Sequence, residues 1–466
     1  METMMMVGWV GVMLLVGMAL RSKVRFLRNA LVPSSVLAGL VGFVLMNTTG
    51  LLLVQPARLT GLVSQLFTVS FISIGLTGTA KKTTIGGTDS AGRSIVQGSL
   101  GMGLTWVLLY AVTAVVGGLC VALAGRLCGM DPVYGLMAPF AFAQGPGQSA
   151  TFGAIMEGYG WPDAAMVGVT FSAIGFIAAF AVGVPLAKAG LRRGIPCNSA
   201  KIDEAMARGY FKPGEQTPKA GTVTCHSGNI DPLAFHVALV GLTYVLTYVV
   251  TSLLAKLIGP LGDTLRGMMF MMGMLCGYLV KALMKRLKID YIHDNETQKR
   301  ITGFATDFLV ASSFMAVQVR VVGRWMVPIL FASLVVCVLT YFVCMYFGRR
   351  FGGRNDFERT LGLWGTSTGT VPSGIGLVRI VDPDLSTTTA VELGAMNIPM
   401  MASAVSVTGI LAIAAGKLSL PLGYLVLLAP VPVYLVLMKV FRVWGKPTYT
   451  LGANNNAGPL PVKKEQ

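Results

Sequence analysis

Long apolar segments dominate the chain and decide what it can fold into. A helix needs about 20 predominantly apolar residues to cross the hydrocarbon layer of a bilayer. Thirteen segments meet or approach that length, at residues 4–20, 31–54, 60–80, 95–125, 132–157, 163–187, 233–255, 261–284, 301–319, 325–347, 357–381, 385–415 and 418–438. Only 12% of the residues are charged, about half the fraction found in soluble domains. We therefore predict an all-α polytopic membrane protein rather than a soluble enzyme.

The rest of the composition contains no pattern typical of a cofactor, a metal or a nucleic-acid partner. The formal net charge is +17, but Lys and Arg lie in the short gaps between apolar segments, where membrane topology explains them. The seven Cys form no C-x-x-C pair, and the three His form no H-x-x-x-H pair. The chain also lacks a phosphate-binding P-loop. We predict no cofactor, no nucleic-acid partner and no enzymatic activity.

Two of the thirteen segments are interrupted near their middle by residues that break helices. Segment 132–157 contains the run Gln144-Gly145-Pro146-Gly147-Gln148-Ser149. Segment 357–381 contains the run Gly365-Thr366-Ser367-Thr368-Gly369-Thr370-Val371-Pro372-Ser373-Gly374. Proline removes a helical hydrogen bond, and glycine has a low helix propensity. We therefore expect neither segment to form one continuous helix.

The distribution of Lys and Arg indicates how these two segments enter the membrane. If both enter and return on the same side, with the N-terminus outside, 29 Lys and Arg fall on the inner side and six on the outer side. If both segments cross instead, the inner side has 15 and the outer side has 20. Cytoplasmic loops normally carry the excess of Lys and Arg. The sequence therefore predicts two re-entrant segments, about 11 transmembrane helices and a cytoplasmic C-terminus.

The same distribution predicts an inverted structural repeat, because the first re-entrant segment enters from outside and the second from the cytoplasm. Weak internal similarity agrees: residues 131–149 align with residues 355–373 at an offset of 224, and Pro162-Asp163 aligns with Pro383-Asp384. We expect a first membrane repeat at 1–188, a cytoplasmic linker at 189–232, a second membrane repeat at 233–416, an extra helix at 417–441 and a partly disordered tail at 442–466.

Broken helices at membrane depth predict a ligand site. Irregular backbone is tolerated there only where it is buried in protein or lines a watery cavity. The free N–H groups at a helix start favour an anion, and free carbonyls can coordinate Na⁺. The candidate substrate-binding residues are Gln144, Gly145, Pro146, Gly147, Gln148, Ser149, Thr368, Gly369, Thr370, Pro372, Ser373 and Gly374, with Thr370 and Ser373 as candidate Na⁺ ligands. The alternative is that these runs only allow close helix packing, although glutamine and proline suit that role poorly.

Few ionisable residues lie within the apolar segments. Asp307 and Glu392 are acidic, and intramembrane ionisable groups are functional candidates by default. Arg320 and Arg379 lie near segment ends, where they can clamp a carboxylate or simply extend to the membrane surface. For all four residues the sequence leaves a functional and a structural role open.

A family resemblance rests on six short runs, at residues 32–39 (VPSSVLAG), 74–76 (IGL), 145–150 (GPGQSA), 157–161 (EGYGW), 165–175 (AMVGVTFSAIG) and 369–373 (GTVPS). Together these runs make the chain similar to the sodium/glutamate symporter family, from about residue 10 to residue 415. The resemblance implies Na⁺-coupled import of glutamate and a homodimer. It also implies a scaffold against which a core containing both broken segments moves.

The chain departs from the family pattern in three places. The run Gln144-Gly145-Pro146-Gly147 stands where the family usually has Gly-Gly-x-Gly with His at x. The second loop is richer in Thr, and residues 418–466 add a final helix and a tail. These departures leave another small anion open as the substrate.

The broken segments predict a secondary active transporter of the inner cell membrane that works by alternating access. The resemblance implies that it carries glutamate, or a similar dicarboxylic amino acid, with Na⁺ by an elevator-like movement. The expected partners are L-glutamate, Na⁺, the lipid bilayer and a second copy of the chain. One alternative is an ion- or proton-coupled carrier of another organic anion, such as a di- or tricarboxylate. A passive channel is a further alternative, although an internal inverted repeat suits a two-sided carrier better.

Overall fold

The computed structural model describes residues 2–29, 32–49, 55–77, 88–197, 205, 208–215, 217, 219–226, 228–257, 265–266, 269–382 and 387–451. Every regular element in this part of the chain is an α-helix or a short 3₁₀ helix. Two features predicted above lie outside the described residues: the pair Pro383-Asp384 and the tail from residue 452 onward.

The elements before the linker are α1 (Glu2–Lys23), α2 (Arg25–Asn29), α3 (Ser34–Thr48), α4 (Pro56–Thr77), α5 (Thr88–Ala124), η1 (Gly125–Leu127), η2 (Pro132–Met137), α6 (Ala138–Phe142), α7 (Pro146–Gly158) and α8 (Ala164–Arg192). The sequence explains both ends of α7, because Pro146 occupies the first helical position, where the missing N–H costs nothing. A glycine-rich turn follows at Gly158 and Gly160.

The elements after the linker are α10 (Pro232–Leu257), α12 (Met269–Arg286), η4 (Asp290–Ile292), α13 (Asn295–Ala316), α14 (Val319–Val322), η5 (Gly323–Trp325), α15 (Met326–Gly348), α16 (Asp356–Thr368), α17 (Val371–Val381), α18 (Thr389–Ala395), α19 (Asn397–Met400), η6 (Met401–Ser403), α20 (Ala404–Ala414), α21 (Leu420–Leu428) and α22 (Val431–Val440). Asp294 caps the start of α13 by accepting the N–H of Thr297 at 2.7 Å.

Eight helices of the described part are long and apolar enough to cross a membrane. They are α1, α4, α5, α8, α10 and α15, together with the stretches α18–α20 and α21–α22. Helix α3 has only 15 residues, and α12 and α13 each carry several charged residues. The all-α polytopic class is therefore confirmed, whereas the count of 11 transmembrane helices stays a prediction.

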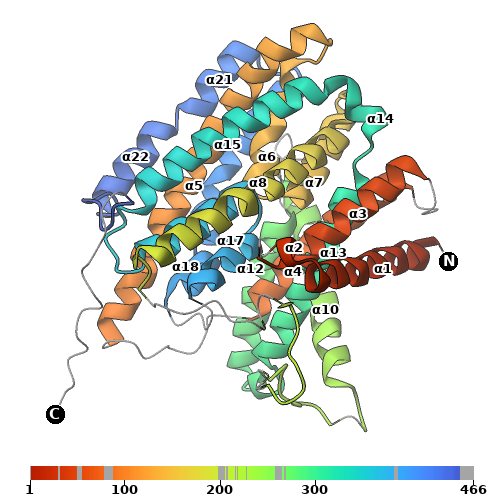
Figure 1. The fold of residues 1–466 in the computed structure, drawn as a ribbon, viewed down its shortest axis with the longest axis vertical. Helices are drawn as coiled ribbons and strands as arrows, with labels where there is room; N and C mark the ends of the chain where they lie inside the picture. Colours follow the sequence, from red (N-terminus) through yellow and green to blue (C-terminus); the bar gives the residue numbers. More distant parts are fainter. Residues whose placement is uncertain are drawn as a thin grey trace.

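The helices divide into two groups (Figure 1). The first, called the α4 group, consists of α1, α3, α4, α10, α12 and α13. In this group α4 packs against α12 and α13, α10 packs on α12, and α1 and α3 pack together. Close contact of Gly75 on α4 with Gly277 on α12 lets these two backbones approach each other. In the second, called the α5 group, the long helix α5 contacts α6, α15, α16, α18 and the C-terminal helices α21 and α22. Both interrupted segments belong to the α5 group.

A stripe of glycines on α8 positions both interrupted segments. Gly168, Gly175, Gly183 and Gly190 are seven, eight and seven residues apart, which places them on one face of a helix with 3.6 residues per turn. A Cβ on Gly168 would lie 2.5 Å from the Met137 side chain, and a Cβ on Gly175 would lie 2.6 Å from the carbonyl oxygen of Thr368. Lacking side chains, these glycines let elements from both interrupted segments rest directly on the α8 backbone.

Candidate functional site

The first interrupted segment folds into a helical hairpin. It consists of η2 and α6, a break at residues 143–145, and α7, which turns back alongside α6. Phe140 before the break stacks on Phe152 after it, with ring centroids 4.6 Å apart. Gly145 stands at the turn with φ 76° and ψ −165°, a backbone conformation that is essentially restricted to glycine. The predicted interruption is therefore confirmed, and its position is set by Gly145 and Pro146.

The second interrupted segment forms a matching hairpin from α16 and α17. A Cβ on Gly365 in α16 would lie 2.8 Å from the Cα of Gly374 in α17, so the two helices touch side by side. The break falls at Gly369 and Thr370, and α17 begins with Val371 and then Pro372. Neither interrupted segment is a continuous crossing helix.

The tips of the two hairpins meet. A Cβ on Gly145 would lie 2.6 Å from the Cγ2 of Thr370 and 3.0 Å from the carbonyl oxygen of Gly369. The contact joins residues that are more than 220 positions apart in the sequence. Since glycine alone leaves room for this approach, the residue type at position 145 is required both by its backbone angle and by its neighbour.

Helix α5 shows that the two hairpins approach from opposite ends. Gly117, near the end of α5, contacts Gly135 at the base of the first hairpin. Gly98, near the start of α5, contacts Arg359 at the base of the second hairpin. Residues 98 and 117 are about 28 Å apart along an α-helix that rises 1.5 Å per residue, which is close to the thickness of a bilayer core. Between them, the indole N–H of Trp106 donates to the carbonyl of Ala143 at 2.9 Å, beside the first tip.

The predicted substrate residues lie together at these tips. The side chains of Gln144, Gln148, Ser149, Thr368, Thr370 and Ser373 are all buried. Gly145, Pro146, Gly147, Gly369 and Gly374 are buried as well, whereas Pro372 is half-buried. The structure thus brings all twelve residues into one region, and their role in binding stays a prediction.

Both tips present the start of a helix within a run of uncharged residues. Residues 140–150 and 364–375 contain no Asp, Glu, Lys or Arg. Helices α7 and α17 begin at the tips with 13 and 11 residues, so their first-turn N–H groups and dipoles create positive potential there. The hydroxyls of Thr370 and Ser373 lie 3.3 Å apart. Such an arrangement of neutral donors and helix starts can hold an anion such as a carboxylate.

The first tip also packs against the α4 group. The position of Gly147 leaves no room for a side chain, because a Cβ there would overlap the ring of Phe67 on α4. The hydroxyls of Ser64 on α4 and Thr151 on α7 are hydrogen-bonded. Phe67 also belongs to a cluster with Phe71 and Phe270, at centroid distances of 4.9 and 4.7 Å. The first tip therefore lies where the first hairpin contacts the α4 group.

Three of the four predicted ionisable candidates lie away from the tips. Arg320 and Arg379 are exposed, as expected for side chains that reach outward from segment ends. Asp307 lies on the exposed side of α13 in the α4 group and forms a side-chain hydrogen bond with Ser35 of α3. None of these three provides a charged contact to the hairpin tips.

Glu392 has a structural partner that the sequence did not reveal. Its carboxylate accepts two hydrogen bonds from Arg359, Nε to Oε2 and Nη2 to Oε1, both at 2.7 Å. Arg359 also donates to Asp356 at 2.9 Å and to the carbonyl and hydroxyl of Ser94 on α5 at 2.9 Å. Arg359 and Glu392 are fully buried. The network ties the base of the second hairpin to α5 and α18. In the sequence Arg359 is only one of the 29 Lys and Arg that fall on the inner side.

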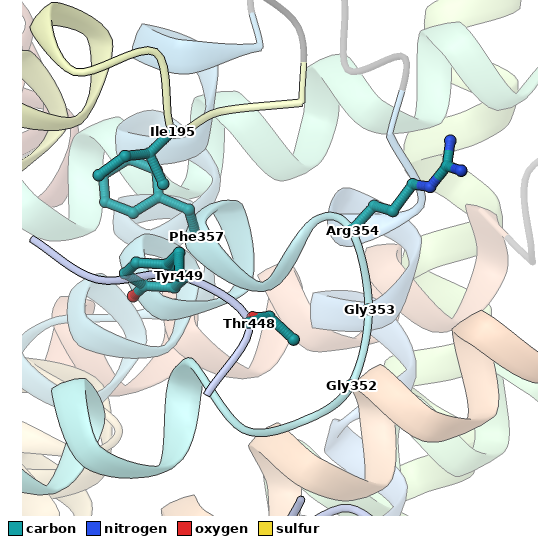
Figure 2. Close-up of a pocket in the computed structure, with 7 residues that line it drawn as sticks. All are labelled: Ile195, Gly352, Gly353, Arg354, Phe357, Thr448 and Tyr449. Carbon is teal, nitrogen blue, oxygen red and sulfur yellow. The ribbon is translucent and has the colours of Figure 1, made fainter. Parts of the chain in front are cut away.

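The C-terminal segment after α22 returns to the same hairpin base. Thr448 donates its hydroxyl to Asp356 at 2.8 Å, and the Tyr449 hydroxyl donates to Thr360 at 2.7 Å. Figure 2 shows Tyr449 beside Phe357, whose ring centroid is 5.3 Å away. Phe357, Thr448 and Tyr449 line a cavity of about 320 Å³ together with Ile195 and the loop Gly352-Gly353-Arg354. The cavity lies at the hairpin base, away from the tips.

These tail contacts predict a modest loss of stability when they are removed. Thr448→Val and Tyr449→Phe are each expected to lower the free energy of unfolding by about 1 kcal/mol. The first removes a hydroxyl bonded to Asp356 and to the carbonyl of Arg349, and the second removes a hydroxyl bonded to Thr360. The melting temperature of the detergent-solubilised protein checks this. Thr450→Val is the matched control, since Thr450 is exposed; equal melting temperatures for all three variants and the parent would contradict the assigned role.

Comparison with known proteins adds one finding. A family model described as sodium/glutamate symporter matches residues 1–379 of the chain. The matched region contains both hairpin tips and ends two residues before the end of α17. No curated protein and no solved structure matches the chain.

Proposed function

The chain belongs to the sodium/glutamate symporter family, and we propose that it takes up glutamate together with Na⁺ by alternating access. Family membership makes it a membrane transporter rather than an enzyme. The observation that carries the proposed mechanism is the contact of Gly145 with Gly369 and Thr370. Two broken helices that meet at their tips form a site that each face of the membrane can reach in turn.

In this proposal the substrate carboxylates bind at the starts of α7 and α17. The first-turn N–H groups and the neutral hydroxyl and amide groups supply donors without a competing negative charge. Backbone carbonyls at the breaks, with Thr370 and Ser373, hold Na⁺. Glutamate carries a net charge of about −1 at neutral pH, so at least two Na⁺ must accompany it for inward movement of positive charge.

The division into two helix groups supports an elevator-like movement. We propose that the α5 group carries both hairpins as one body, because Arg359, Glu392 and Ser94 join α16, α18 and α5 by buried hydrogen bonds. The α4 group is the scaffold, and the surface around Phe67 and Ser64 is where the two groups slide. An inverted repeat, an outside N-terminus, a cytoplasmic C-terminus, residence in the inner membrane and a homodimer complete this proposal.

Reconstituted vesicles test the proposal. Glutamate uptake is expected to accumulate substrate only under an inward Na⁺ gradient and to saturate with glutamate concentration. Counterflow with a panel of unlabelled anions identifies the preferred substrate. Uptake that ignores Na⁺ and follows pH would assign the protein to a proton-coupled organic-anion carrier, and flux that neither saturates nor accumulates would make it a channel.

A further inference from the structure

Gln148 holds a buried amide with one end unpartnered. Its side chain is fully buried in the first turn of α7. The oxygen Oε1 accepts a hydrogen bond from the Tyr110 hydroxyl at 2.9 Å, whereas Nε2 has no hydrogen-bond partner among the described residues. Leaving a buried N–H₂ group without an acceptor costs free energy. An acceptor that arrives with a ligand would remove that cost.

Tyr110 pairs with the oxygen end of the amide and leaves the nitrogen end free within the described part of the chain. A tyrosine hydroxyl that donates to Oε1 holds the amide so that the N–H₂ group is directed elsewhere. Tyr110 is itself fully buried on α5, with the Trp106 ring 5.0 Å and the Phe140 ring 6.0 Å from its own centroid. These neighbours hold the phenol ring in place, so the Tyr110 hydroxyl stays beside Oε1 of Gln148.

The free N–H₂ group lies where an anion is favoured. Gln148 is the third residue of α7, within the turn whose backbone N–H groups lack helical acceptors. A carboxylate oxygen bound there would accept from Nε2 and from the same positive end of the helix. The opposite orientation of the amide would present an oxygen to a carboxylate, which is repulsive.

We propose that Gln148 donates its amide N–H₂ to a carboxylate of the substrate and that Tyr110 is the positioning residue that fixes this orientation. The inference rests on the proposed function, since it names one carboxylate contact of the same site. It adds Tyr110, a residue of α5 outside both hairpins, to the groups that set substrate affinity and selectivity.

The test uses the full-length protein in proteoliposomes and measures initial uptake over a range of glutamate concentrations. Tyr110→Phe and Gln148→Ala are each expected to raise KM about tenfold while Vmax changes less than about twofold. The double variant is expected to match Gln148→Ala, because Tyr110 acts through Gln148. Thr105→Val is the matched control: it removes a buried hydroxyl of the same helix, which donates to the carbonyl of Gly101 within α5, and is expected to leave KM unchanged.

A second readout separates a positioning role from a general packing defect. Competition is measured with two analogues, glutamine and the α-amide of glutamate, each lacking one carboxylate. In Tyr110→Phe and Gln148→Ala, discrimination against one of these amides is expected to fall about tenfold, because the lost contact served that carboxylate. Gln148→Glu, which places a carboxylate where the amide was, is expected to abolish uptake while the protein elutes as the parent does in gel filtration.

The outcomes distinguish this inference from the proposed function. If the parent protein carries another carboxylate rather than glutamate, the proposed substrate is wrong, and the same variants are measured with that anion and its amide. If Tyr110→Phe leaves KM and discrimination unchanged, or if the two single variants combine additively, the inference is overturned although transport itself stands. Full uptake by Gln148→Glu would also overturn it.

Discussion

Replacing Gly145 with alanine is expected to reduce Na⁺-driven glutamate uptake by at least about tenfold while the protein remains folded. The substitution forces a Cβ into a glycine-only backbone region with φ 76° and ψ −165°, at a cost of about 1–3 kcal/mol. The new Cβ would also lie 2.6 Å from Thr370 Cγ2, so the two hairpin tips must separate. The measurement is the initial uptake rate per mole of reconstituted protein.

Gly160→Ala is the matched control for this variant. Gly160 also has a positive φ, of 95°, but a Cβ there would meet no atom within 4 Å. The Gly160→Ala variant therefore introduces backbone strain without obstructing the tips, and this variant is expected to retain uptake. If Gly145→Ala transports as fast as Gly160→Ala, the contact between the tips is not required for transport, and the proposed site must lie elsewhere.

Replacing Arg359 with leucine is expected to destabilise the protein by about 3–5 kcal/mol, because removing one partner of a buried ion pair leaves the other partner without compensation. Here two carboxylates would lose their partner, since Arg359 bonds both Asp356 and Glu392 and all three side chains are buried. We expect a large drop in melting temperature and a low yield of folded protein in detergent.

Two further variants make this expectation specific. Arg354→Leu removes an exposed arginine from the same loop and is expected to keep the parent melting temperature, because exposed charges contribute little to stability. Adding Glu392→Gln to Arg359→Leu removes one of the two uncompensated carboxylates and is expected to recover part of the loss. A melting temperature of Arg359→Leu equal to that of Arg354→Leu would show that the buried network does not hold the hairpin base.

The breaks in the two hairpins could be predicted from sequence because helix formation is local. Gly145, Pro146, Gly369 and Pro372 lower helix stability through their own backbone, whatever lies around them. The structure accordingly begins α7 at Pro146 and α17 at Val371. The long apolar segments and the low fraction of charged residues are likewise local properties of the chain, which is why the polytopic class followed directly from it.

Other parts of the site could not be predicted, because they depend on which helices become neighbours. Arg359 and Glu392 are 33 residues apart, and Tyr110 and Gln148 are 38 residues apart. Before the fold is known, Arg359 is simply a loop charge and Tyr110 is one aromatic residue in an apolar run.

The amino-acid sequence by itself determined the all-α polytopic class, where two segments break and what neutral chemistry lies at the breaks, since each of these follows from residues close together in the chain. Only the tertiary structure decided that Gly145 touches Thr370, that the glycines of α8 lie against both hairpins and that Thr448 returns to Asp356. Those contacts arise from the packing of whole helices, and a buried hydrogen bond between distant residues forms only after that packing has brought its donor and acceptor together.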